Sequence, residues 1–179
     1  MSLQKIIETP LSNFDIDKYF EPVKTSIVEY SQLQNMNTFP FDADNKCIIF
    51  FASGQNIGHW LCVLNHEEQK LIEWFDSYGL QVGGDVKWLS KQEQKQLNEY
   101  SFYAKNIMKN YANNGYKTTY NNFDFQSKKP DINTCGRWCV VRSMCYNMLL
   151  PEFKQYIQES SKKLNLSLDG LVAYITDKL

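Results

Sequence analysis

The sequence predicts an α+β protein, and two observations carry that prediction. Stretches with apolar residues at helical spacing lie toward both ends of the chain, and short β-rich runs lie between them. The 179 residues are 43% hydrophobic and 15% aromatic, a composition that excludes a disordered chain. No repeat or low-complexity linker interrupts it, so we expect one domain over residues 1–179.

The first half begins with a helical pattern and continues with strands. Leu11–Met36 is expected to be mostly helical, with Ser12 or Asn13 as the N-cap. Lys46–Ser53, "KCIIFFAS", has the short β-rich apolar composition of a central strand. A hairpin is expected next, because two further apolar runs flank the polar loop "HEEQ".

The second half is expected to be mainly helical. Ser90 and Glu93 form a capping-box pattern that opens a helix, which should end near Asn113–Gly115. The remaining expected elements are, in order, a strand within 116–126, a loop over 127–133, a helix over 135–150 stopped by Pro151, and helices over 152–163 and 168–178.

Charge and cysteine content exclude several classes of function. With 19 basic and 20 acidic residues the formal net charge is -1, so no nucleic-acid partner is predicted. No apolar run approaches the ~20 residues of a membrane span, and the N-terminus lacks a secretory pattern. Five cysteines without framework spacing indicate free thiols in a reducing compartment. A monomer is the default expectation.

The hairpin brings a histidine and an acid together. If His66–Gln69 form its loop, Asn65 pairs with Lys70 and His59 falls opposite Asp76. A carboxylate so placed can hold an imidazole in one tautomer and stabilise its cation. A register shift of one residue would put the two side chains on opposite faces, in which case the pair would have no chemical meaning.

The segment "NTCGRWCVVRSMC" places Cys135 where a loop passes into a helix. Unpaired N–H groups and the helix dipole favour an anion there, and a nearby imidazolium lowers a thiol pKa further. Gly136 would leave the approach to the sulfur open. The alternative is that Cys135, Cys139 and Cys145 belong to one buried apolar stripe of the helix, because cysteine is among the most frequently buried residues.

These residues carry a family resemblance. "GHWLCVLNHEEQKLIEWFDSYG", then Gln126, then "NTCGRWC" resembles the adenain-like viral maturation proteases, a superfamily that includes the proteases of ubiquitin-like modifiers. Asp76 is more similar to the enzymes of virophages and large DNA viruses than to those with glutamate. The resemblance implies a central mixed sheet with helices on both sides and a nucleophile at the N-terminus of a buried helix.

The resemblance also implies a role for each residue. Cys135 would be the nucleophile, His59 the general base and acid, and Asp76 its orienting partner. The Gln126 amide and the Cys135 N–H would form the oxyanion hole, although Gln126 precedes the cysteine by more residues than is usual and Asn133 is an alternative donor. Trp60 and Gly136 would bind substrate in a narrow channel selective for Gly-Gly or Ala-Gly sites. No metal or other cofactor is implied.

The implied function is cleavage of viral capsid or core precursors during virion maturation, in the virion or the host cytoplasm, with an activating peptide as an option. Deconjugation of a ubiquitin-like modifier, acetyl transfer by the same triad and a non-enzymatic interaction module are the alternatives. For His66, the other histidine, we expect a solvated turn position beside Glu67 and Glu68. A zinc site of His59, Cys135 and Cys139 is disfavoured, because no second close pair of ligands accompanies it.

Overall fold

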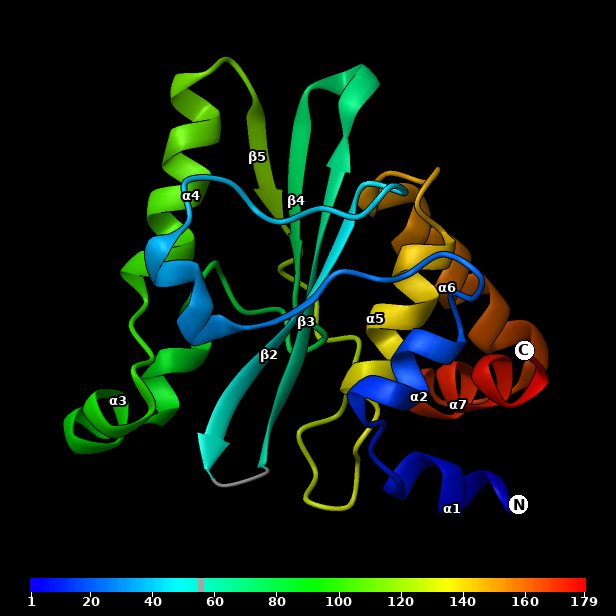
Figure 1. Cartoon of the computed structure of the whole chain (residues 1–179). Coiled ribbons are helices and arrows are strands. Elements are labelled where there is room, and N and C mark those ends of the chain that lie inside the picture. Colours follow the sequence, from blue (N-terminus) through cyan, green and yellow to red (C-terminus); the bar gives the residue numbers. More distant parts are fainter. Residues whose placement is uncertain (55–56) are drawn as a thin grey trace.

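The computed structural model describes residues 1–54 and 57–179 and has an α+β architecture, as the sequence predicts (Figure 1). One mixed sheet has the strand order β1-β2-β3-β4-β5. The central strands β2, β3 and β4 are antiparallel, while β1 and β5 add parallel edges. The strands are β1 Ile27–Glu29, β2 Lys46–Gly54, β3 Ile57–His66, β4 Leu71–Phe75 and β5 Lys117–Tyr120.

Helices cover both faces of this sheet (Figure 1). On one face lie the 3₁₀ segment η1 (Tyr30–Asn35) and α4 (Phe102–Asn113). On the other face lie α5 (Cys135–Met144), α6 (Leu150–Leu164) and α7 (Leu168–Lys178), with α2 (Asn13–Lys18) beside α5 and α1 (Leu3–Glu8) beside α7. None of the helices among the described residues combines the length and the hydropathy that a bilayer-spanning segment needs.

The two-sided cover explains the composition of the central strands. In β3, Leu61 and Val63 face the core under α4, whereas Cys62 faces the core under α5. A strand buried on both faces has an apolar side chain at every position rather than at alternate ones. The run Trp60–Leu64 is therefore continuously apolar, and it holds the sheet between two hydrophobic layers.

The prediction of a long helix over Leu11–Met36 is wrong. The Ser12 cap is correct, with a full capping box to Asp15, but α2 ends at Lys18. Pro22 follows, and proline lacks the N–H that a continuing helix requires. The chain then becomes extended in β1 before η1 begins.

Two other helix boundaries also differ. The capping box of Ser90 is present, but the helix it opens, α3 (Lys91–Leu97), ends at Asn98 in a left-handed conformation, and α4 is a separate helix. Farther along, α5 stops before Pro151, because the Arg142 guanidinium binds the carbonyls of Cys145 and Met148. Pro151 lies in the first turn of α6, where proline is tolerated.

The hairpin is present with a displaced loop. The turn uses Glu67–Lys70, because Lys70 takes the left-handed conformation and His66 pairs with Leu71. Asn65 consequently pairs with Ile72 instead of Lys70. Displacing the loop by one residue moves each partner by two, so every side chain keeps its face of the sheet. The register prediction is wrong, yet the prediction that His59 and Asp76 share a face does not depend on it.

Candidate active site

His59 and Asp76 are bonded at one end of the sheet. Asp76 directly follows β4, and its Oδ1 accepts a hydrogen bond of 2.8 Å from Nε2 of His59 in β3. Both side chains are buried, with the carboxylate fully so. The phenol ring of Tyr78 stacks on the imidazole at a centroid distance of 4.6 Å. This packing and the carboxylate fix both the tilt and the tautomer of His59.

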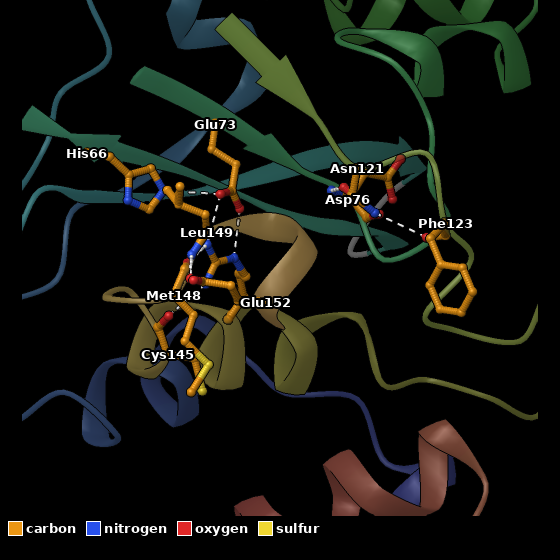
Figure 2. A network of polar contacts seen from close by, with 10 residues as sticks. His66, Glu73, Asp76, Asn121, Phe123, Cys145, Met148, Leu149 and Glu152 are labelled. Atoms are coloured by element: carbon orange, nitrogen blue, oxygen red, sulfur yellow. Dashed lines mark hydrogen bonds and ion pairs between the residues drawn. The ribbon is translucent and has the colours of Figure 1, made fainter. Parts of the chain in front are cut away.

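A tight turn and one asparagine hold Asp76 in place. The Gly79 N–H donates to the Asp76 carbonyl at 2.8 Å, and Gly79 has a positive φ of 70°, which glycine adopts without strain. Asn121, beyond β5, accepts from the Asp76 N–H and donates to its carbonyl (Figure 2). Its side chain also reaches the Phe123 carbonyl. The Asp76 backbone is therefore bonded on both sides, which restrains its carboxylate.

Cys135 is the first residue of α5, and the helix start is left without a side-chain cap. Thr134, at the N-cap position, instead donates its hydroxyl to Asp169 of α7 at 2.5 Å. The other oxygen of Asp169 accepts from the Ser127 N–H, so α7 holds both ends of the 127–134 loop. Uncapped N–H groups at a helix start stabilise negative charge, either on the thiol or on a substrate oxygen.

His59 and Cys135 change each other's acidity. Burial raises the pKa of the Cys135 thiol, but its interaction with His59 and the nearby Trp60 and Gly136 N–H groups outweigh this and lower the pKa. Burial lowers the pKa of His59, but Asp76 and Cys135 together raise it well above the ordinary value. The opposite shifts favour a thiolate–imidazolium pair, the reactive form of a cysteine nucleophile.

Gln126 bonds Tyr78, whose ring stacks on His59, and its amide orientation is fixed. The Ser77 hydroxyl donates to Oε1 at 2.8 Å, while Nε2 donates to the Ile132 carbonyl and to the Tyr78 hydroxyl. A carbonyl can only accept, so the nitrogen must face Ile132 and the bonded Tyr78. Asn133, the alternative donor, gives its amide to the Glu8 carbonyl of α1. Gln126 is thus the amide held toward the aromatic ring that covers His59.

A cavity of about 890 Å³ is lined in part by Cys135. Trp60 forms part of its lining and is fixed by a 2.9 Å hydrogen bond from its indole N–H to the Leu11 carbonyl. Gly136 lies beneath this wall, where a Cβ would come within 3.1 Å of both Leu11 and Trp60. The structure therefore assigns Gly136 to close packing of α5 under the cavity and places Trp60 at its surface.

The remaining polar residues of the sequence prediction lie elsewhere. Cys139 is buried against Cys62 in the core, and that burial raises its pKa well above the usual value. The solvated position expected for His66 is wrong: its ring is buried and stacked on Tyr146, and its Nε2 lies 3.1 Å from Glu73 (Figure 2). Glu73 also binds Arg142 of α5 through both carboxylate oxygens.

The sequence prediction missed a segment that packs against His59. The 3₁₀ segment η3 (Gly84–Trp88) places the Trp88 ring edge-on to both His59 and Tyr78, at 5.9 and 5.5 Å. It also buries Asp85 beside the His59–Asp76 pair. Its lack of a strong helical pattern explains the omission, although an aspartate and a tryptophan three residues apart after the Tyr78–Gly79 turn were a usable signal.

Comparison with known proteins identifies a viral relative. The chain is 34% identical over 171 residues to "Uncharacterized protein V9" of the Sputnik virophage, and the match covers 93% of each chain. It belongs to this virophage protein family. No described protein-family profile matches the chain. The comparison thus supports a viral origin, whereas any statement about chemistry has to be argued from the residues of the site.

Proposed function

We propose that this virophage-family protein is an adenain-like cysteine endopeptidase that cleaves precursors of viral structural proteins. One observation carries the proposal: Asp76, His59 and Cys135 form a buried acid–imidazole–thiol line that ends at a helix start beside a cavity. The mixed sheet with helices on both faces supports the adenain-like fold as part of the same proposal.

The proposed reaction uses these groups in sequence. The Cys135 thiolate attacks the scissile carbonyl carbon, and the oxygen takes the negative charge beside the first N–H groups of α5 and the Gln126 amide. The His59 imidazolium then protonates the leaving amine as the C–N bond breaks. Water, deprotonated by His59, hydrolyses the resulting thioester and restores the thiolate.

The cavity wall supports selectivity for small residues. Trp60 is held on one side by Leu11 and contacts the Phe50 ring at 4.8 Å on another, so it has little freedom to move aside. A fixed indole next to the nucleophile would exclude branched side chains at the cleaved position. We therefore propose cleavage after Gly or Ala, in viral assembly sites or virions.

The first test is site-resolved alkylation followed by peptide cleavage. Limiting iodoacetamide between about pH 5 and pH 9, read by mass spectrometry, should modify Cys135 fastest below neutral pH. His59→Ala should abolish that advantage. The wild type should then cleave peptides with Gly-Gly or Ala-Gly, as should Cys145→Ala, whereas Cys135→Ala should not. Equal reactivity of Cys135 and the half-buried Cys145 would contradict the proposal. Cleavage that requires an intact folded modifier would indicate deconjugation instead.

A further inference from the structure

Asp85 is a buried carboxyl that no hydrogen bond from the surrounding described residues stabilises. Asp85 is 1% exposed, and neither of its carboxylate oxygens has a hydrogen-bond partner among the described residues. Asp76 Oδ2 is also without a partner in that part of the chain. One ring nitrogen of His59 and one carboxylate oxygen from each aspartate lie within 4.8 Å of one another.

Two carboxylates this close in a buried site do not ionise together readily. Asp76 already accepts hydrogen bonds from His59 and from the Tyr78 N–H, which stabilise its charged form. Asp85 accepts no such hydrogen bond from the described residues, and the charge of His59 and its own backbone N–H favour its ionised form less than burial and Asp76 oppose it. Asp85 is therefore the group that keeps its proton. Burial and, after it, the charge of Asp76 raise the pKa of Asp85 to about 7.

We propose that Asp85 is a positioning residue that regulates the charge of the His59–Asp76 pair. This inference rests on the proposed cysteine-protease function and extends it. With Asp85 neutral, the charges beside His59 are those of Asp76 and the Cys135 thiolate, whereas ionised Asp85 adds a further negative charge. The added charge stabilises the imidazolium and keeps His59 protonated, and thus able to protonate a leaving amine, at higher pH.

Other groups also face Asp85, and none of them supplies the missing donor. Lys87 is on the same 3₁₀ segment and lowers the Asp85 pKa less than Asp76 raises it. The other titratable groups around Asp85 are Tyr30 of η1, Tyr78 after β4, and Glu99 between α3 and α4. Glu99 is also a buried carboxyl, and its pKa is raised to about 8, mainly by burial. It therefore serves as the control for Asp85.

The decisive measurement is an NMR titration of both histidines in the full chain. The sequence has two histidines, and His66 lies in the separate Glu73–Arg142 network, so it serves as an internal reference. Asp85→Asn keeps the size and the neutral state. It should lower the pKa of His59 by about one unit or more while His66 titrates as before. Glu99→Gln should leave both histidine titrations unchanged.

The alkylation rate of Cys135 by iodoacetamide, measured as a function of pH, gives a second test, in which only one limb of the curve should change. At acid pH Asp85 is neutral, so the acid limb of the profile should coincide in the wild type and Asp85→Asn. The alkaline inflection, where His59 loses its proton, should move to lower pH in the variant. Movement of both limbs would indicate a structural defect rather than charge regulation.

The wild type alone also tests the proposal if the variant does not fold. Aspartate labelled with ¹³C at the side-chain carboxyl should show one resonance with a midpoint near pH 7, mirrored by a small change at His59. If no aspartate titrates there, or if His59 does not respond, the proposal is overturned. None of these titrations uses a substrate, so failure of peptide cleavage would overturn the proposed function and leave the Asp85 result standing.

Discussion

Asp76 bonds His59, and His59 lowers the pKa of Cys135, which gives a prediction about single residues. Asp76→Asn removes the charge that raises the pKa of His59. The thiolate–imidazolium pair then loses stability, and we expect Cys135 alkylation below neutral pH to fall about tenfold or more. Mass-spectrometric rates measure the change, and Asp131→Asn in the exposed 127–133 loop is the control. An unchanged rate would show that the acid has no influence on the thiol.

Gln126 should affect the transition state more than substrate binding. Its amide is held in place because Oε1 accepts from the Ser77 hydroxyl and Nε2 donates to the Ile132 carbonyl. Nε2 also donates to the Tyr78 hydroxyl, which a substrate oxygen could replace. Gln126→Ala should therefore reduce kcat by about 10²–10³-fold with little change in KM. Steady-state kinetics on a cleaved peptide test this, with Gln155→Ala on the exposed face of α6 as the control. A change confined to KM would exclude an oxyanion role.

At the scale of elements, β4 and α5 are joined by a buried ion pair. Glu73 binds Arg142 at 2.7 and 2.8 Å. Glu73 also bonds His66, as Figure 2 shows. Glu73→Ala leaves Arg142 buried without its partner and should lower the free energy of unfolding by about 3–5 kcal/mol. The double change Glu73→Leu with Arg142→Met should recover most of that loss. Urea unfolding measures both, and an additive loss in the double variant would contradict a paired role.

The same pair predicts acid sensitivity. Burial raises the pKa of Glu73, but Arg142 and His66 outweigh it, so the pKa lies below its usual 4.5. A depressed pKa contributes stability above the unfolded value and loses it as the pH falls through the folded value. The free energy of unfolding should thus fall on acidification below about pH 4.5 in the wild type, and less steeply in the double variant. Parallel curves for the two proteins would contradict this.

Element boundaries show where sequence reasoning succeeds. β2, the closing helices and the Ser12 and Ser90 caps were predictable because each depends on neighbouring residues. The early end of α5 was not, because its cause is Arg142 binding carbonyls beyond the helix. The hairpin register failed on the left-handed Lys70, yet the shift by two residues still left His59 and Asp76 in contact.

At the scale of the whole molecule, the stability of the fold should depend on Asp85 with the opposite sign to Glu73. Its pKa is raised, so the folded state holds a proton that the unfolded chain releases above about pH 4. The free energy of unfolding should fall as the pH rises toward 7, by up to about 4 kcal/mol for a rise from 3.8 to about 7.

Asp85→Asn removes this dependence, so the variant should be more stable than the wild type at pH 8 and similar at pH 4. Urea unfolding at the two pH values tests the difference. Both proteins share the His59–Asp76 pair, so the comparison isolates Asp85. Equal stabilities at both pH values would show that folding does not raise the pKa of Asp85.

The composition of the site also shows the limits of prediction at this scale. Cys135, His59, Asp76 and Gln126 could be proposed from the sequence because their order along the chain resembles that of a known family. Asp85, Asn121 and Asp169 were not, since each acts through a contact between distant segments. His66 was misjudged for the same reason: Glu73 is seven residues away, but Tyr146 and Arg142 come from the other side of the core.

The bond from Asp169 to Thr134 sets an order of events during synthesis. Thr134 leaves the ribosome 35 residues before its acceptor, so the start of α5 lacks this bond until the first turn of α7 has been made. A nascent chain that ends before Asp169 should therefore carry a Cys135 no more reactive with iodoacetamide than its other thiols. Translation itself would delay the reactivity of the Cys135 thiol until the polypeptide has passed this point.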